Sequence, residues 1–415
     1  MRVMYERCAG LDVHKKTVVA CVITPDGQQE WQQELRTFKT MSGDLLQLAD
    51  WLGQHGVTHV AMESTGVYWK PVFNMLEAEF EVMVVNAKHI KFVPGRKTDV
   101  KDAQWIAELL QHGLLKGSFI PEAPQRDLRE LVRYRTHLIQ ERTREVNRVH
   151  KVLEDANLKL SSVATDIMGV SGRAMLAAVI AGKDDPAALA DLAKGRMRTK
   201  IEELEQALTG RIKDNHRLLL RLHLEHIDDL NAKLAELEEE IGKLLSPFDQ
   251  DDLVERLDEI PGINQVTAQI IIAEIGTDMS RFPTANHLTS WAGLAPGKNE
   301  SGGRNRSSKT LKANRYLRPA LVQVAHAVGK TDTYLGEKYR RLARRRGKKR
   351  AAVAVARTML VIVYHLMRDG TRFIEHGADF FDQLKPKSTE QWLTRRLERL
   401  GYKVTLEPLE DAVAA

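Results

Sequence analysis

The sequence has few of the features that mark secreted, zinc-binding or membrane-spanning proteins. Its two cysteines, Cys8 and Cys21, lie in adjacent apolar segments without zinc-ligand spacing, and no secretory signal precedes them. We therefore expect reduced packing residues in a cytoplasmic protein. The longest apolar stretch, residues 351–367, carries Arg357 near its centre and follows a dense Arg/Lys run. This pattern disfavours a membrane-spanning helix and predicts a buried core helix.

A large excess of one charge is also missing. Lys plus Arg number 62 against 56 Asp plus Glu, which gives a formal charge of +6 and a pI near 9.1. Such a small excess matters only where it is clustered. The hydrophobic content of 43% and the charged content of 28% are typical of globular proteins and exclude wholesale disorder. A chain of 415 residues is too long for one ordinary core, so two or three domains are expected.

The N-terminal region alternates between strand and helix patterns. Two β-rich runs at 5–12 and 17–24 and a third candidate at 30–38 predict a three-stranded meander. The segments that follow are predicted in this order: a helix at 41–55, a strand at 58–64, a helix from about Val67, a strand at 80–86 and a helix opening at Asp99. The order βββαβαβα is that of a ribonuclease-H-like domain, so the fold class is α/β followed by α.

The rest of the sequence has helical periodicity. Residues 128–160 predict a long helix with one cationic side, and the apolar spacing within 199–245 predicts a coiled-coil seam that ends at Ser246-Pro247. The seam residues are Ile227, Leu230, Leu234, Leu237, Ile241 and Leu244. Residues 257–276 predict two helices joined by a Pro-Gly turn. This is either a helix-hairpin-helix motif, whose turn amides meet a nucleic-acid phosphate, or a plain turn between helices.

Four carboxylates suggest a metal site. Asp12 interrupts an otherwise apolar strand, where a buried carboxylate is costly without a compensating cation, and Glu63 closes a second strand. Asp99 and Asp102 lie three apart at a helix start and share one face. Together the four are suited to Mg²⁺ or Mn²⁺. A helix cap and a dipole partner would explain Asp99 and Asp102 alone, but not Asp12.

Three basic segments, 129–151, 298–318 and 338–350, indicate a polyanionic partner held at several places, although any one of them could be a solvated helix face. Tyr316 and Tyr339 lie among these segments and are expected to serve core packing more than contacts with bases. The predicted nucleic-acid contacts are Arg304, Arg306, Lys309, Lys312, Arg315, Arg344, Arg345, Arg346, Lys348 and Lys349.

The motifs GLDVHKKT, MESTGVYW and KTDVKDA, followed far downstream by IPGINQVTA, FPTANHLTSWAGLAP, SGG and NRYLR, resemble one family. It is the IS-one-ten family of bacterial insertion-sequence transposases, related to Piv invertases. The resemblance implies a RuvC-like domain at 1–125, a helical linker and coiled coil at 126–250, a serine-containing helical transposase domain with the helix-hairpin-helix motif at 251–375, and a tail at 376–415. It also implies a cytoplasmic protein that acts at the nucleoid.

The resemblance further implies a DNA recombinase guided by a bridge RNA that pairs with donor and target DNA. Asp12, Glu63, Asp99 and Asp102 would bind the metal ions, and Ser301 of the SGG motif would be the nucleophile. On physical grounds alone, Ser307 and Ser308 compete with Ser301, and a serine in a Gly-rich loop is most often a linker residue. Where the family commonly has glycine before Asn-Arg, this chain has KANRYLR. We expect a homodimer through residues 199–245, a tetramer at synapsis and no membrane partner, although an intramolecular hairpin would also explain the coil.

Two other functions fit parts of the pattern. A RuvC-like nuclease or junction resolvase would use the carboxylates and water, without the serine. A non-catalytic nucleic-acid scaffold would use the carboxylates only as structural groups. Covalent capture of DNA by the protein would distinguish a serine recombinase from both.

Overall fold

The computed structural model describes residues 2–26, 30–86, 102–297, 299–301, 304–307, 310, 313–384 and 386–406. The chain divides into two compact units, Met1–Pro121 and Glu122–Ala415. Unit 1 is mixed α/β and unit 2 is almost entirely helical. The division into four parts at residues 125, 250 and 375 stays a prediction.

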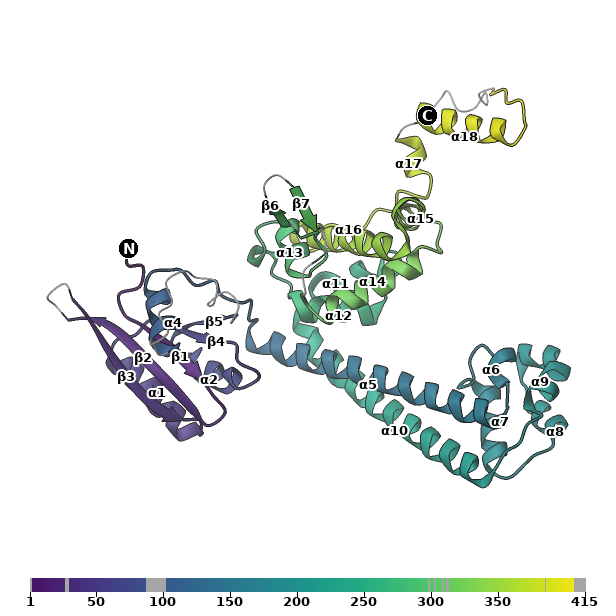
Figure 1. The fold of residues 1–415 in the computed structure, drawn as a ribbon, viewed down its shortest axis with the longest axis horizontal. Helices are drawn as coiled ribbons and strands as arrows, with labels where there is room; N and C mark the ends of the chain where they lie inside the picture. The colour runs from purple at the N-terminus through teal and green to yellow at the C-terminus, as the bar shows by residue number, and fades with distance from the viewer. Residues whose placement is uncertain are drawn as a thin grey trace. The chain divides into compact units, whose positions relative to one another are not determined.

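Unit 1 is built on a five-stranded sheet with the order β3-β2-β1-β4-β5 (Figure 1). Its elements are β1 (Cys8–Val13), β2 (Thr17–Pro25), β3 (Trp31–Lys39), α1 (Ser42–Gln54), β4 (His59–Glu63), α2 (Trp69–Leu76), β5 (Glu81–Val85) and α4 (Asp102–Gln111). The first three strands are antiparallel neighbours, and β4 and β5 run parallel to β1. The predicted meander is confirmed, and each strand of this sheet lies within three residues of its predicted bounds, whereas the strands of the β6–β7 hairpin were not predicted.

The two faces of the sheet carry different helices. Leu11 and Val13 of β1 belong to a core shared with α1 and α2, whereas Cys8 packs with α4. Both cysteine thiols are buried and unbridged, as predicted. Burial raises the pKa of each to about 12, with nearby Cys21 adding to the rise at Cys8 and Glu108 to that at Cys21. Both thiols are therefore protonated packing groups at neutral pH.

Gly10 lets α4 approach β1 closely. A Cβ atom at this position would lie 2.3 Å from both the Ala103 carbonyl oxygen and the Ala107 amide nitrogen. Neither backbone atom can move without shifting the helix. Glycine is thus required by contact between two backbones, a use that its missing side chain allows.

Gly10→Ala should lower the free energy of unfolding by about 2–3 kcal/mol, the upper part of the range for overpacked cores. Urea denaturation of the full chain measures this, and Gly53→Ala is the matched control. Gly53 lies in α1 with open space around its missing side chain, so alanine there should be neutral or stabilising by up to about 1 kcal/mol. Equal destabilisation by the two substitutions would contradict the close contact at Gly10.

Unit 2 is helical apart from one short hairpin. Its helices are α5 (Ala123–Asp155), α6 (Leu160–Val163), α7 (Val170–Ile180), α8 (Pro186–Ala190), α9 (Ile201–Leu208), α10 (Asp214–Leu245), α11 (Leu253–Asp258), α12 (Gln265–Ile275), α13 (Ala285–Trp291), α14 (Leu317–Val328), α15 (Tyr334–Arg346), α16 (Lys348–Asp369), α17 (Phe380–Gln383) and α18 (Pro386–Arg399). Short 3₁₀ turns lie at Gly195–Lys200, Ser246–Phe248, Gln250–Asp252 and Met279–Arg281. The hairpin strands are β6 (Asn299–Ser301) and β7 (Arg304–Ser307).

The long helices α5 and α10 pair antiparallel within one chain (Figure 1). Leu138 of α5 packs against Leu230 and Leu234, and α6–α9 form a small core at the end of α5 where Leu153 lies. The seam residues Ile227, Leu230, Leu234 and Ile241 are all buried, and Leu237 and Leu244 are partly buried. The seam is therefore occupied by α5 of the same chain, and it does not form one continuous helix over 199–245. Dimerisation through this segment stays a proposal.

The core of α11–α16 forms around α16. This is the one helix among the described residues with the length and composition to cross a membrane, but half of its most apolar window is buried. Val355, Met359 and Val363 have no exposed surface and join the core of this part of unit 2. The prediction of a buried core helix at 351–367 is confirmed.

Candidate carboxylate site and serine hairpin

Asp12 and Glu63 occupy equivalent places at the ends of neighbouring parallel strands. Leu11 of β1 pairs with Met62 of β4, and each carboxylate follows directly. Side chains alternate along a strand, so Asp12 shares a face with Gly10, and Glu63 shares a face with Ala61. Gly10 and Ala61 both lie against the α4 side of the sheet. The two carboxylates therefore lie on the α4 face, as the predicted strand order requires.

Asp102 opens α4 directly above this face. Asp102 directly precedes Ala103, and the Ala103 carbonyl oxygen packs against Gly10 of β1. Gly10 is two residues before Asp12 in the same strand. Asp99, the fourth predicted ligand, lies outside the described residues. Three of the four carboxylates thus come from β1, β4 and the first turn of α4, which pack on one another.

Asp12 lies at a partly exposed position near the end of β1. Its side chain is 22% exposed, and its Oδ2 is 3.1 Å from Nε2 of the more exposed His14. The Thr65 hydroxyl donates to Glu63 Oε1 at 3.4 Å. Among the described residues no three His, Cys, Asp or Glu side chains are grouped closely enough to hold an ion. The donors present are hard carboxylate oxygens at a partly wet strand end, which fits Mg²⁺ or Mn²⁺.

Ser301 ends the first strand of the β6–β7 hairpin. Its backbone pairs with Arg304, while Asn299 pairs with Ser307 at the open end. Ser301 is thus next to the hairpin turn, and Ser307 is next to the chain that leads on to α14. Ser308, the other alternative, lies outside the described residues. The strand pairing therefore places Ser301 and Ser307 at opposite ends of the hairpin.

The predicted nucleic-acid contacts fall into two groups. Arg304 and Arg306 lie in β7, Arg315 is exposed just before α14, and Lys309 and Lys312 lie outside the described residues. The second group, Arg344–Arg346 with Lys348 and Lys349, is exposed where α15 meets α16. Within the described residues none of these five side chains has an ion-pair partner, so this junction is a compact cationic surface.

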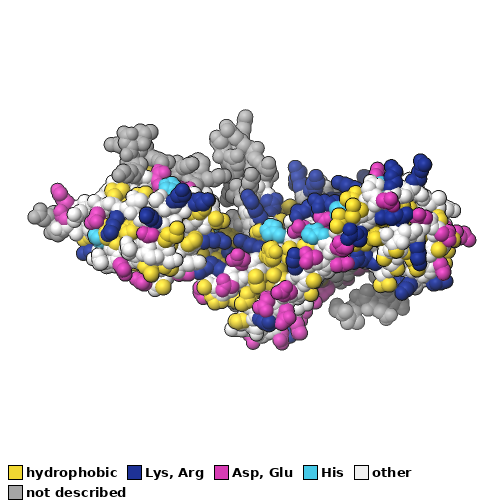
Figure 2. All heavy atoms as spheres, turned by 90° about the horizontal axis from the view of Figure 1, so that it is seen from below, with side chains coloured by type: hydrophobic (Ala, Val, Ile, Leu, Met, Phe, Trp, Pro, Cys, Tyr) yellow, Lys and Arg dark blue, Asp and Glu magenta, His cyan; other side chains and the backbone are white. Residues whose placement is uncertain are grey.

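The basic segment at 129–151 was expected to face a polyanion, and this prediction is wrong for three of its six arginines, Arg129, Arg133 and Arg135. Arg135 has no exposed surface and pairs with Glu238, and Arg129 and Arg133 pair with the buried Glu274. Arg142 donates to Asn231 at 3.0 Å. Figure 2 shows Lys and Arg interspersed with Asp and Glu over the face in view. These arginines face inward because α10 and α12 present acceptors to them.

Two tyrosines and one turn serve packing. Tyr339 is 8% exposed and its hydroxyl contacts His326, while Tyr316 contacts His137. Gly262 of the Pro-Gly turn has a φ of +86°, and a Cβ there would lie 2.4 Å from Val328 of α14. Packing and backbone conformation therefore explain this glycine, and phosphate binding by the turn stays a proposal.

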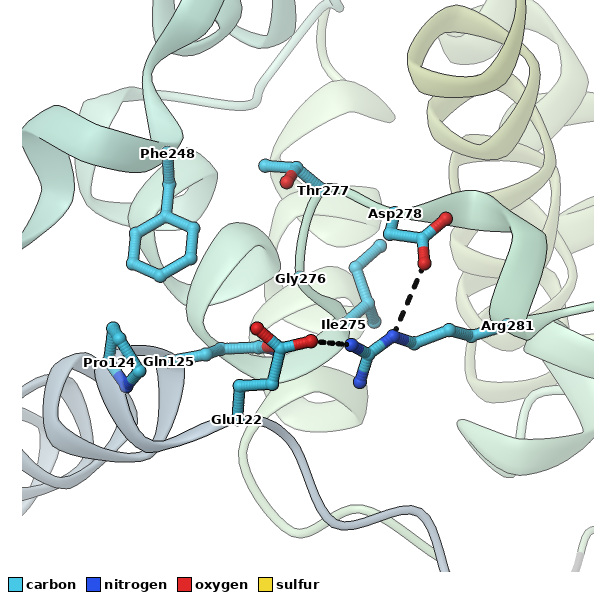
Figure 3. Close-up of a pocket in the computed structure, with 9 residues that line it drawn as sticks. All are labelled: Glu122, Pro124, Gln125, Phe248, Ile275, Gly276, Thr277, Asp278 and Arg281. Carbon is cyan, nitrogen blue, oxygen red and sulfur yellow. Dashed lines mark hydrogen bonds and ion pairs between the residues drawn. The ribbon is translucent and has the colours of Figure 1, made fainter. Parts of the chain in front are cut away.

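A polar cavity of about 160 Å³ lies where α5 begins (Figure 3). Arg281 points into it and pairs with Glu122 at 2.5 Å and with Asp278 at 3.4 Å. Hydrogen bonds from Ser280 and then from Arg281 lower the pKa of Asp278, which keeps its carboxylate charged. The Arg281 guanidinium is therefore paired with two carboxylates, and its pair with Glu122 links the turn at Met279–Arg281 to the start of α5.

Sequence reasoning missed Glu274 as an important residue. It is the one acid in the apolar run of α12 and has no exposed surface. A signal was present in the sequence, because an acid in such a run needs cationic partners and α5 carries arginines four residues apart at 129 and 133.

The comparisons with known proteins define the class of this chain as transposase. A family model of IS110 type, described as transposase, matches residues 9–158, and one described as transposase of the IS116/IS110/IS902 family matches residues 254–340. The first match contains the four carboxylates and the second contains Ser301. The chain belongs to the IS110 family of transposases.

Individual relatives span most of the chain at low identity. The transposase for insertion sequence element IS1111A of Coxiella burnetii is 25% identical over 367 residues, covering 86% of this chain and 88% of the relative. A probable family 20 transposase of Pseudomonas aeruginosa is 27% identical, covering 77% and 87%. The pilin gene-inverting protein of Moraxella lacunata is 24% identical, covering 88% and 96%.

Proposed function

We propose that this transposase cuts and rejoins DNA through Ser301, with Mg²⁺ held by Asp12, Glu63, Asp99 and Asp102. The observation that carries the proposal is the placement of Asp12 and Glu63 at equivalent ends of adjacent parallel strands, on the face that α4 covers. The sheet order β3-β2-β1-β4-β5 supports a ribonuclease-H-like, RuvC-like fold for unit 1. When bound, Mg²⁺ would supply positive charge beside the reacting phosphate.

The serine would conserve the energy of the broken bond. Its hydroxyl oxygen forms a bond to phosphorus as the bond from phosphorus to the leaving strand oxygen breaks, and the serine proton passes to a base or to water. The product is a phosphoserine link to one DNA end and a free hydroxyl on the other. Attack by a strand hydroxyl on that link reverses the step and releases the serine.

The partners in this proposal are donor DNA, target DNA and a bridge RNA that pairs with both. The exposed surface of Arg344, Arg345, Arg346, Lys348 and Lys349 supports a polyanion contact. Arg304, Arg306, Lys309, Lys312 and Arg315 would add contacts beside the serine. A dimer, and a tetramer at synapsis, would bring together the copies needed to exchange strands.

Covalent capture of DNA tests the chemistry. Full-length protein incubated with DNA carrying the ends of its own element, with RNA transcribed from the flanking non-coding DNA and with Mg²⁺, should give an adduct that survives denaturant. Mass spectrometry should place the adduct on Ser301. Cleavage without any adduct would instead support a metal-dependent nuclease that uses water, and the absence of both would favour a scaffold.

RNA recovery tests the guidance. Protein purified from cells that carry the whole element should retain an RNA that maps to DNA flanking its gene. Recombination in the absence of any such RNA would leave the serine chemistry standing and remove the guide from the proposal.

A further inference from the structure

The carboxylate of Glu274 is shared by two different segments of unit 2. Arg133 of α5 donates Nε to Oε1 at 2.7 Å and Nη2 to Oε2 at 2.8 Å. The Asn314 side chain donates Nδ2 to Oε2 at 2.6 Å. A fully buried carboxylate is tolerated only when its oxygens are paired, and these bonds pair both of them.

Helix α5 holds Glu274 in place independently of Asn314. Arg129 donates Nε to the Ala273 carbonyl at 3.0 Å and Nη2 to the Glu274 carbonyl at 2.6 Å, and Gln125 donates to Ala273 at 3.2 Å. These bonds satisfy the last carbonyls of α12, where cations are favoured. Burial lowers the pKa of Arg129 to about 10, against the opposing effect of Glu274, so the guanidinium stays charged at neutral pH.

Asn314 connects the Glu274 carboxylate to the start of α14 through hydrogen bonds. Its Oδ1 accepts hydrogen bonds from the amides of Tyr316 and Leu317, both at 2.9 Å, which caps the helix. The Arg133 guanidinium lies 4.7 Å from the centre of the Tyr316 ring. Asn314 is therefore held on both sides of its amide, by α12 through Nδ2 and by α14 through Oδ1.

The chain that returns from the serine hairpin is held at a second point as well. Arg318 of α14 donates Nη2 to the Thr310 hydroxyl at 2.8 Å. Thr310 follows β7 by three residues, and Asn314 comes four residues later. Thr310 and Asn314 thus lie between the β6–β7 hairpin and α14 in the chain, and the side chain of each is hydrogen-bonded to a helix of unit 2.

We infer that Glu274 is a positioning residue for the β6–β7 hairpin: through Asn314 it fixes the segment that joins the hairpin to α14, and so fixes where Ser301 is presented. The link to catalysis rests on the proposed function, in which Ser301 is the nucleophile. A displacement of about 1 Å at a reacting group can slow a reaction roughly 100-fold, so a contact remote from the reacting atoms can control the rate.

An exchange of the two side-chain types tests the inference. Glu274→Gln leaves amide donors facing the donors of Arg133 and Asn314, and Asn314→Asp sets two carboxylates against each other. In the double variant the amide introduced at position 274 would donate to the carboxylate introduced at position 314, and its oxygen would still accept from Arg133 Nε. The bond between the two side chains is thus restored with donor and acceptor exchanged, the total charge beside Arg129 and Arg133 is kept, and only the bond from Arg133 Nη2 stays lost. We expect each single variant to slow adduct formation roughly 10- to 100-fold at saturating DNA, and the double variant to be at least about threefold faster than the slower single variant.

Hydrogen exchange at the Tyr316 and Leu317 amides is the second measurement, because it does not depend on the chemistry. Exchange should be faster in both single variants and should recover in the double variant. Val363→Ala, an apolar core change in α16, is the control for general destabilisation and should leave the adduct rate at saturating DNA within about threefold of the parent.

The inference is overturned if the double variant is as slow as the slower single variant, or if the single variants lose no more rate than Val363→Ala at equal melting temperature. It is also overturned if exchange recovers in the double variant but the rate does not. Retention of the adduct by Ser301→Ala would refute the serine assignment separately. Strand-cleavage rates in the parent, the two single variants, the double variant and Val363→Ala would then decide the positioning role by the same criteria.

Discussion

Ser301→Ala should abolish the covalent DNA adduct and reduce strand cleavage at least about 1,000-fold, which corresponds to roughly 4 kcal/mol of transition-state stabilisation. Alanine removes the only atom that would bond to phosphorus and leaves the backbone able to keep its pairing with Arg304. DNA binding should stay within about twofold, because a neutral hydroxyl contributes little to attraction of phosphates. Adduct yield in denaturing gels and binding by anisotropy measure the two effects separately.

Ser307→Ala is the matched control for this result. Ser307 is in the same hairpin, but its backbone pairs with Asn299 at the open end. We expect it to keep the adduct. Loss of the adduct in Ser307→Ala with retention in Ser301→Ala would move the nucleophile to the base of the hairpin. Full cleavage by Ser301→Ala without any adduct would identify water as the nucleophile and make the protein a nuclease.

Asp12→Asn should abolish both cleavage and adduct formation, again by about 1,000-fold or more, since it removes one of the charges that would hold Mg²⁺. Protein stability should change little. The Asp12 contact with His14 is partly exposed, and such surface pairs contribute about 0–1 kcal/mol. The measurements are single-turnover cleavage over a range of Mg²⁺ and Mn²⁺ concentrations and thermal melting of the same samples.

The control is Asp50→Asn, which makes the same chemical change on the opposite side of the sheet. Asp50 is exposed on α1, and α1 packs on the face that carries Leu11 and Val13 rather than on the α4 face. Its activity should match that of the parent protein. Wild-type activity in Asp12→Asn, or activity in excess chelator, would contradict the carboxylate metal site.

The sheet of unit 1 could be predicted from sequence because its information is local. β-branched runs and turn residues mark each strand, and the predicted strand order places Asp12 and Glu63 at the ends of neighbouring strands. The register of β1 against β4 then shows why both side chains lie on the α4 face. Asp99 stays a prediction, because it lies outside the described residues.

The helical unit was less predictable because its structure depends on which helices pack against each other, and these helices are far apart in the sequence. The spacing of Ile227, Leu230 and Leu234 indicates an apolar seam but cannot tell whether a second chain or α5 occupies it. The arginines of α5 similarly look like a cationic surface until Glu238 and Glu274 are placed beside them. Sequence spacing shows that an apolar residue needs an apolar neighbour or that a buried charge needs an opposite charge. Only the tertiary structure shows which residue fills that place.

The inward-facing arginines of α5 also affect how strongly salt should act on this protein. A cation that meets a DNA phosphate releases a condensed counterion, and this release makes binding depend on salt concentration. Arg129, Arg133 and Arg135 acquire their anionic partners from Glu274 and Glu238 when the chain folds. These three arginines therefore release no counterions from DNA when the protein binds it. The dependence of DNA binding on ionic strength is therefore set by the exposed cations, and counting basic residues in the sequence overestimates it.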